Sequence, residues 1–369
     1  MKKGGFFRVA AIVAAATIGD GIFALPYVFY RAGWFISLFY LVALAIFVST
    51  AHVIYLATLE KRGEKERLLG LTRKYFGTPG FWVGFVAIIV GLILTLVAYL
   101  ILGTQFIHLA FPSVPTSVAF FVFWLFISLP VFLDDRYVMD LELFGIACTS
   151  CVILFIFLSA WPNITFAGIP AIEPGNFFLP FGVILFALAG WTSVEPAYES
   201  RKRLGIRGGP VRGLAFGTFF VAILYVMFAA GILGSVPVVS PDTASGLTTW
   251  PVWKKEILAI FGLLAVATVY IPISREIKNS LEKDLRWSKF AARSLIVLLP
   301  IFLIGLGFNN FLVVVGLVGG LFLSVQYLLI ISVGRRALIL TPVKKFLLDV
   351  IALAFIIAAV YELWIFIVH

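Results

Sequence analysis

The chain has 369 residues, of which 62% are hydrophobic and only 12% are charged, and its mean hydropathy is +1.10. Ordinary globular proteins carry roughly a quarter charged residues, so this composition cannot supply a water-soluble surface. Soluble enzymes and soluble receptors are therefore excluded, and the chain is predicted to be an all-α integral membrane protein. A β-barrel is excluded as well, because the apolar runs are continuous and do not alternate with polar residues.

Eleven apolar runs are long enough to cross a hydrocarbon core of roughly 30 Å as helices of about 20 residues. They cover residues 6–30, 34–58, 81–110, 117–133, 137–161, 177–198, 211–234, 254–274, 290–308, 311–333 and 345–367. We predict eleven transmembrane helices in a single domain over residues 1–369, with no soluble part. Any function must then lie among the helices.

The net charge of +10 reflects orientation in the membrane. If the N-terminus is cytoplasmic, 25 of the 28 Lys and Arg residues fall on the inside, and only Arg31, Lys254 and Lys255 fall outside. The positive-inside rule describes this bias. We therefore predict a multi-pass protein of the cell membrane, with the N-terminus cytoplasmic, the C-terminus outside and no nucleic-acid partner.

Two acidic residues stand inside apolar runs beside helix-weakening residues. Asp20 lies in "IGDGIFALP" (18–26) of the first run, and Glu195 lies in "LAGWTSVEP" (188–196) of the sixth. Interrupted helices at matching places in two halves of a chain are typical of transporter binding sites. Five is an odd number, so two groups of five spans form an inverted repeat, predicted at about 6–161 and 177–333. The helix at 345–367 is additional.

A purely structural interpretation of both acidic residues stays open. Asp20 can cap the second half of the first helix. The segment "TSVE" at 192–195 fits a capping box, in which Glu195 reaches back to the start of its half-helix. Both interpretations still require the helices to be broken. The CxxC pair Cys148 and Cys151 lacks further metal ligands, and we interpret it as small side chains at a helix contact.

Four segments together resemble the amino acid–polyamine–organocation superfamily, and most closely its amino acid/auxin permease branch, which includes bacterial aromatic amino acid permeases. They are "GDGIFALPYVFYRAGW" (19–34), "LVAYLILGTQFIHLAF" (96–111), "PFGVILFALAGWTSVEPAYESRKR" (180–203) and "FLVVVGLVGGLFLSVQYLLI" (311–330). Each motif is loose by itself, but their order covers almost the whole chain. The resemblance implies the LeuT-type fold and alternating access, with substrate held near the bilayer midplane between helices 1, 3, 6 and 8.

Carried over by position, the resemblance implies two unwound segments that bind substrate, with an aromatic residue of helix 3 facing them. The implied substrate-binding residues are Gly19, Asp20, Gly21, Ile22, Tyr99, Ala189, Gly190, Trp191 and Thr192. Freed amides at half-helix N-termini suit a substrate carboxylate, and carbonyls at half-helix C-termini suit an ammonium group. Trp191 and Tyr198 are candidates for an aromatic wall or gate.

The chain departs from the family pattern at the site for the coupling ion. Relatives usually carry a small or neutral residue where Asp20 stands, so Asp20 either binds substrate as a neutral acid or pairs with a cationic substrate. A sodium site would use the Thr268 hydroxyl with carbonyls near Ala15, Ile18 and Ala265, but the second hydroxyl is replaced by Val269. The fifth span contains no lysine, the residue that some proton-coupled relatives place there. Asp20 and Glu195 are the candidate proton carriers.

The function expected from these residues is secondary amino acid transport, with proton symport favoured over sodium symport. A carrier of a cationic amine or basic amino acid stays open, as does a non-transporting nutrient sensor. A metal-ion carrier of the same fold would need a soft ligand such as methionine in the helix-6 break, and "ALAGWTS" has none. No enzyme motif is present. We expect no metal, no cofactor besides the transported H⁺ or Na⁺, and no obligate protein partner; the partners are a small substrate and the lipid bilayer.

The topology is testable by labelling introduced cysteines in intact cells. Cysteines introduced by Arg67→Cys, Arg203→Cys and Lys283→Cys are expected to be protected from an impermeant thiol reagent. Asn163→Cys is expected to react, because the segment around it is predicted to lie outside. Labelling of position 203 from outside would overturn the arrangement.

Overall fold

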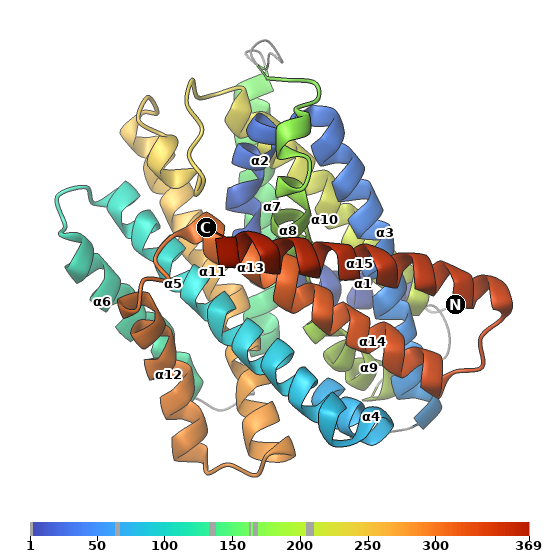
Figure 1. Cartoon of the computed structure of the whole chain (residues 1–369). Coiled ribbons are helices and arrows are strands. Elements are labelled where there is room, and N and C mark those ends of the chain that lie inside the picture. The colour runs from blue at the N-terminus through green and yellow to red at the C-terminus, as the bar shows by residue number, and fades with distance from the viewer. Residues whose placement is uncertain are drawn as a thin grey trace.

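The computed structural model describes residues 3–62, 67–132, 138–161, 164, 169–203 and 210–368, and every regular element in those ranges is a helix. Position 163, used in the topology prediction, lies outside the described residues. A helical element lies over each of the eleven predicted runs (Figure 1). The all-helical fold class is therefore confirmed.

The chain order of the elements is as follows. They are α1 (Lys3–Thr17), η1 (Asp20–Ala24), α2 (Leu25–Ala32), α3 (Trp34–Arg62), α4 (Leu68–Phe85), η2 (Val86–Val90), α5 (Gly91–Ala110), α6 (Thr116–Ser128), η3 (Leu129–Phe132), α7 (Val138–Ala160), η6 (Pro174–Asn176), α8 (Leu179–Leu188), η7 (Trp191–Ser193), α9 (Val194–Arg203), α10 (Pro210–Leu233), η8 (Ala244–Gly246), α11 (Val252–Asn279), η9 (Ser280–Asp284), α12 (Lys289–Gly305), α13 (Phe311–Leu317), η10 (Val318–Leu323), α14 (Ser324–Ala337) and α15 (Pro342–Val368).

Length and composition identify fewer membrane spans than the eleven apolar runs. In the described residues, seven helices are long and apolar enough to cross a membrane, and the bent pair at the N-terminus makes eight. Two further apolar helices, Thr116–Phe132 and Ala147–Ala160, have 17 residues or fewer. α12 also has 17 residues and carries Lys289 and Arg293 in its first turns. The count of eleven and the inverted repeat stay predictions.

Contacts between helices far apart in the sequence hold the bundle together. α1 packs on α10, α5 packs on α11, and α8 packs against η10. The interior is apolar and contiguous, with Phe29, Val48, Leu96, Ile184 and Val266 each essentially inaccessible to solvent. Lipid is as apolar as these side chains, so close packing and interhelical hydrogen bonds must hold the helices together.

The contact of α8 with η10 is the closest of these approaches. η10 is a π-helical turn, and Gly319 within it lies so near Gly182 of α8 that an added Cβ would stand 1.8 Å from the Gly182 carbonyl oxygen. π-bulges are frequent at functional sites, and small residues let helix backbones meet in membranes. The tenth span is thereby pressed against the first half of the sixth.

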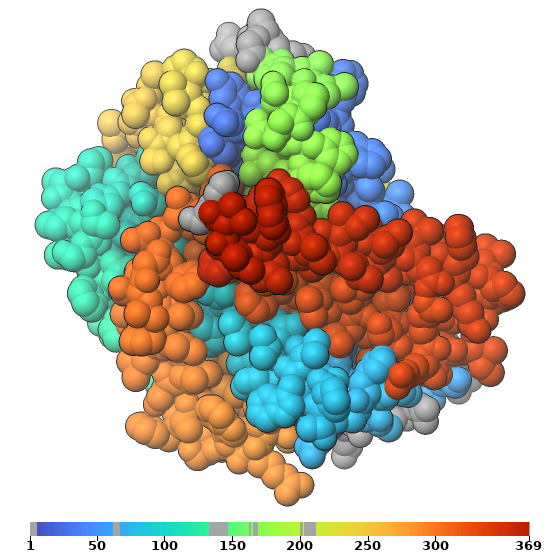
Figure 2. Space-filling view, viewed as in Figure 1, coloured from blue at the N-terminus to red at the C-terminus, as the bar shows by residue number. Residues whose placement is uncertain are grey.

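The last helix lies on the outside of the bundle. α15 crosses the face formed by α14 and α13 obliquely (Figure 1) and contacts α14, η10, α13 and α8. It forms a ridge on the surface in Figure 2, in agreement with the 17% of its most apolar window that is buried. This helix is therefore peripheral to the core, as its position after the two predicted repeats suggests.

We predict that Gly319→Ala destabilises the protein by about 1–3 kcal/mol, because overpacking forces backbones apart at that cost. The matched control is Gly305→Ala at the end of α12, where an added Cβ meets nothing within 4 Å. It is expected to be neutral or slightly stabilising, since alanine favours helix over glycine. Thermal unfolding of the purified variants in detergent measures both. Equal melting temperatures for the two variants would contradict the observed contact.

Candidate functional site

The first span is broken where the sequence places glycines around an aspartate. α1 ends at Thr17, Ile18 and Gly19 are not helical, and the chain resumes as the 3₁₀ turn η1 at Asp20. The two halves are bent by 57° relative to one another. Pro26 stands in the first turn of α2, where its missing N–H costs nothing. The break leaves the last carbonyls of α1 and the first amides of η1 without partners in their own helix.

The sixth span is interrupted in the same manner. α8 ends at Leu188, Ala189 adopts an extended conformation, and Gly190 precedes the 3₁₀ turn η7. The Ser193 hydroxyl donates to the Gly190 carbonyl oxygen at 2.6 Å. α9 then begins at Val194. Both helix interruptions expected from the sequence are therefore present.

The two breaks are in direct contact. A Cβ on Gly21 would stand 2.6 Å from Cα of Ala187 in α8, and a Cβ on Gly190 would stand 2.4 Å from Oγ1 of Thr17 in α1. Because glycine has no side chain, Gly21 of the first break lies directly against α8, which ends at the second break. For the same reason Gly190 of the second break lies directly against α1, which ends at the first break. Two cavities of the described residues, of about 780 and 300 Å³, are lined by other residues. The expected polar cavity between the breaks stays a prediction.

Tyr225 of α10 joins the two breaks. Its hydroxyl lies 2.7 Å from the Thr17 carbonyl oxygen and 2.7 Å from the Ala187 carbonyl oxygen. These two oxygens belong to the last turns of α1 and α8, where helix dipoles concentrate negative charge. A hydroxyl has one hydrogen to donate. One of the two carbonyls therefore keeps the capacity to accept a hydrogen bond from another donor.

Asp20 is buried beside these carbonyls. Its side chain is 1% exposed, and its Oδ2 atom has no hydrogen-bond partner. The carboxylate lies close to the backbone amides of Asp20 and Gly21. It also interacts electrostatically with Tyr99 and Tyr225. The structure thus brings Tyr99, expected from helix 3, to the first break.

The residues of the predicted sodium site lie around the same break. Val269 of α11 packs on Gly19, with its methyl groups 3.1–3.2 Å from a Cβ built there. The neighbouring Thr268 is buried, but its hydroxyl donates to the Ala265 carbonyl oxygen at 2.9 Å within α11. Ile18 donates its amide to the Ala14 carbonyl oxygen. Two of the predicted sodium ligands, Thr268 and Ala265, are therefore bonded to each other.

Trp191 is hydrogen-bonded to Gln326 of α14, a residue that the sequence analysis did not identify. Its Nε1 donates to Oε1 of Gln326 at 2.6 Å, and Nε2 of Gln326 donates to the Ala87 carbonyl oxygen at 2.7 Å. Ala87 lies in the π-helical turn η2. An amide in the middle of an apolar run was the available signal for Gln326. Tyr198 is only half-buried, and its predicted gating role stays untested.

Glu195 does not complete the capping box predicted for "TSVE". The Tyr55 hydroxyl donates to its Oε1 in a very short hydrogen bond, and Oε2 lies 3.5 Å from Nε of Arg67. Nη1 of Arg67 also donates to Oε2 of Glu276 in α11 at 2.7 Å. We call Tyr55, Arg67, Glu195 and Glu276 the Arg67 cluster. The sequence did not predict this cluster, because its residues are far apart in the chain. Arg67 lies in a loop and Glu276 lies near the end of a span, where charged residues are ordinary.

The single guanidinium of Arg67 faces two carboxylates in this cluster, those of Glu195 and Glu276. Burial alone lowers the pKa of Arg67, but the neighbouring Glu276 and Glu195 carboxylates outweigh burial and raise it. Arg67 therefore stays charged. Its guanidinium connects the loop before α4 with both α9 and α11. The cluster closes one side of the broken helices.

The opposite side of the first break is covered by aromatic side chains and a loop. Phe23 of η1 packs against Phe106, Phe228 and Phe261 with ring centroids 4.6–5.7 Å apart. Thr243, in the loop between α10 and α11, donates its hydroxyl to the Phe23 carbonyl oxygen in a short hydrogen bond. The breaks are therefore covered on two sides by separate sets of contacts.

Comparisons with known proteins give a family and a fold. The profile of the family described as "Transmembrane amino acid transporter protein" matches residues 2–330. No curated protein sequence matches the chain. A manganese transporter of Eremococcus coleocola, solved with an aromatic bis-isothiourea substituted compound, is similar over 97% of this chain and 94% of its own, with 14% identity and a TM-score of 0.60. Two single-residue mutants of that transporter are 15% identical over the same shares, with TM-scores of 0.60 and 0.59. At this identity the likeness shows the fold alone.

The contact between the breaks can be tested by paired substitution. Gly190→Ala is expected to lower the melting temperature, because its Cβ meets Oγ1 of Thr17 at 2.4 Å. Thr17→Ala removes that oxygen, which otherwise bonds the Val13 carbonyl within α1. The double variant is expected to regain at least half of the lost stability, with a coupling of about 0.5–3 kcal/mol. Additive effects of the two substitutions would mean that the residues do not touch.

Proposed function

This chain belongs to the transmembrane amino acid transporter family, and we propose that it moves an amino acid across the cell membrane by alternating access, in symport with protons. The family and the fold are those of a permease and not of an enzyme. Substrate identity, the coupling ion and the conformational cycle belong to the proposal. No cofactor besides the coupling ion is proposed.

The observation that carries the proposal is the shortage of hydrogen-bond donors at the paired breaks. The carbonyls of Thr17 and Ala187 share the single proton of Tyr225, and Oδ2 of Asp20 has no donor. An α-ammonium group carries three donors and would satisfy both needs. The substrate carboxylate would bind amides at the N-termini of η1 or η7, where the helix dipole favours negative charge.

Asp20 supports a proton as the coupling ion. Two carboxylates near one another in a buried site cannot both stay ionised at low cost. An amino acid that brings its carboxylate to these amides would therefore bind together with a proton on Asp20. Sodium is less well supplied, because Val269 fills the position next to Thr268 and leaves a single side-chain hydroxyl there. Sodium symport and a cationic substrate paired with ionised Asp20 are the alternatives.

Alternating access needs two barriers that open in turn. The Arg67 cluster and the Phe23–Thr243 contacts lie on different sides of the breaks and are built from different elements. We propose that the Arg67 cluster is the cytoplasmic barrier, consistent with the predicted cytoplasmic N-terminus. Glu195 stands two residues after η7, so movement of the sixth break would reach the cluster directly.

Manganese transport is the second candidate, because the similar solved structures are manganese transporters. Asp20 would supply one hard oxygen ligand. The described residues contain no group of three or more His, Cys, Asp or Glu side chains that could hold a metal. The helix-6 break contains no methionine. The amino acid proposal has the better support from this chain's own residues.

Asp20→Asn separates the roles of Asp20, since it keeps size and hydrogen bonding but fixes the group as neutral. We expect the purified variant in liposomes to retain substrate counterflow and to lose accumulation driven by an inward pH gradient, with or without sodium. The matched control is Asp349→Asn, because Asp349 pairs with Arg335 on the periphery of the bundle.

Each other outcome points to a different mechanism. Loss of substrate binding in Asp20→Asn would indicate a cationic substrate. Wild-type accumulation that requires sodium would indicate sodium symport. Binding without any counterflow in the wild type would indicate a sensor, and Mn²⁺ uptake without amino acid uptake would indicate a metal carrier. Unchanged pH-driven accumulation in Asp20→Asn would leave Asp20 as a helix cap.

A further inference from the structure

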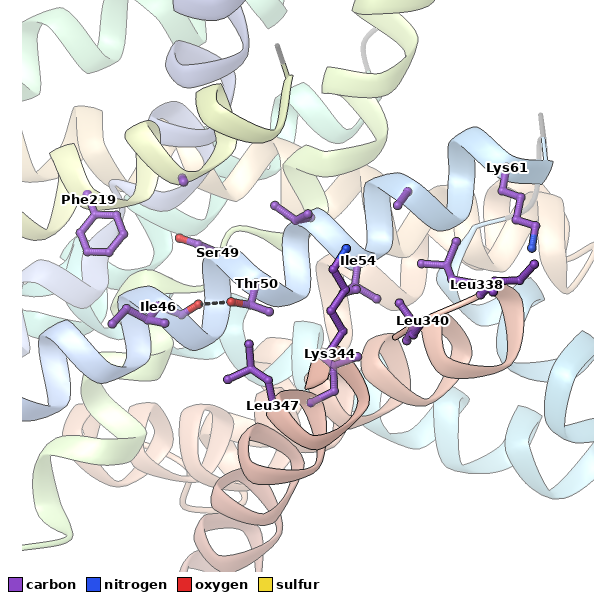
Figure 3. Close-up of a pocket in the computed structure, with 15 residues that line it drawn as sticks. Ile46, Ser49, Thr50, Ile54, Lys61, Phe219, Leu338, Leu340, Lys344 and Leu347 are labelled. Atoms are coloured by element: carbon purple, nitrogen blue, oxygen red, sulfur yellow. Dashed lines mark hydrogen bonds between the residues drawn. The ribbon is translucent and has the colours of Figure 1, made fainter. Parts of the chain in front are cut away.

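A groove of about 780 Å³ lies on the side of the bundle, away from the helix breaks. It is enclosed by α3, α10 and the segment that joins α14 to α15, together with the start of α15 (Figure 3). We call it the α3–α15 groove. Its volume falls within the range of small-molecule sites, about 300–1,000 Å³.

The walls of the groove are apolar. Ile46 and Ile54 of α3, Phe219 of α10, Leu340 of the linker and Leu347 of α15 face the space. The Thr50 hydroxyl is turned back to the Ile46 carbonyl oxygen at 2.7 Å (Figure 3). The walls therefore offer mainly hydrocarbon surface, with the Ser49 hydroxyl as a polar group that has no partner.

The groove belongs to the lipid-facing surface. Ile339, Val343 and Phe346 beside it are 71–96% exposed, and α15 is a peripheral helix. In a membrane such side chains contact acyl chains, because lipid tails are as apolar as they are. The ligand that reaches this groove comes from the bilayer.

Two lysines line the groove, Lys61 at one end and Lys344 beside Ile54 (Figure 3). Nζ of Lys61, at the end of α3, donates to the Ala337 carbonyl oxygen at 2.9 Å. Lys344 reaches from the first turn of α15 toward α3 (Figure 3), and no acidic side chain of the described residues pairs with it. No Asp or Glu is among the described residues that line the groove. A ligand that fits these charges is anionic at one end.

We propose that the α3–α15 groove binds an anionic phospholipid, with an acyl chain along α3 and the headgroup phosphate between Lys61 and Lys344. Basic pockets between transmembrane helices on the cytoplasmic side bind anionic headgroups, and the predicted topology places both lysines on that side. Lysine side chains at helix ends extend to the headgroup level while their stems stay in hydrocarbon. A zwitterionic lipid would fill the apolar space equally well but would bring its own cation to the two lysines.

The test compares phosphatidylglycerol with phosphatidylcholine of the same acyl chains, added to the purified full chain in detergent. A ligand that binds the native state raises its melting temperature. We expect the larger rise with phosphatidylglycerol, and an about tenfold higher half-saturating concentration for the Lys61→Gln/Lys344→Gln double variant. Lys345→Gln is the matched control, since Lys345 is adjacent in sequence but does not line the groove.

A second measurement locates the lipid without relying on a variant. Phosphatidylglycerol with a photoreactive group on its acyl chain is expected to crosslink to α3 between residues 46 and 57 in the wild type. Equal melting shifts with the two lipids, an unchanged preference in the double variant, or crosslinks confined to other helices would each overturn the proposal. Neither measurement depends on transport, so the lipid proposal can fail while the proposed function holds, and the reverse.

Discussion

The Tyr225 hydroxyl is the group on which the two interrupted helices depend. In hydrocarbon an unsatisfied backbone group costs several kcal/mol, so a helix can be broken in a membrane only where other groups satisfy its ends. The Tyr225 hydroxyl lies within hydrogen-bond distance of both the Thr17 and the Ala187 carbonyl oxygens, and its single hydrogen is shared between them. The absence of side chains at Gly21 and Gly190 brings the ends close enough to share one phenol. A single side chain thereby fixes the first and sixth spans to each other at their breaks.

Further hydrogen bonds connect the second break to helices on the other sides of the bundle. Trp191 is bonded to Gln326, which is bonded to Ala87 in the π-helical turn η2. Glu195, on the half-helix that follows, is bonded to Tyr55 and Arg67. A shift of the sixth break would therefore disturb two polar networks at once. In the proposed cycle, substrate and a proton at Asp20 would compete for the carbonyls that Tyr225 now serves, and the networks would transmit the change to the Arg67 cluster.

The periphery of the molecule follows a different physical rule. α15 is mostly exposed, and with α3 and α10 it borders an apolar groove that is lined by two lysines. In the interior each strong donor or acceptor must find a partner in the protein, whereas at the surface the bilayer itself supplies apolar and anionic partners. The proposed phospholipid would fill the apolar groove and pair with its lysines, whereas in the interior Tyr225 supplies the hydrogen bond within the protein itself.

The sequence by itself determined the helical membrane class, the positions of the helical segments and the two breaks, because hydropathy, Gly, Pro and charge act over a few neighbouring residues. It also singled out Asp20, which is buried as its place in an apolar run implied. It did not find Tyr225, since a tyrosine in an apolar run has no mark that tells a lipid-facing residue from a bonded one. Gln326 was missed although an amide in an apolar run is itself a signal of a bonded polar group. The sequence left the role of Glu195 open between a local helix cap and a proton carrier. Only the tertiary structure decided that Tyr55, Arg67 and Glu276 surround it, because these residues come from separate helices and loops, and hydrogen bonds between them depend on how the helices pack.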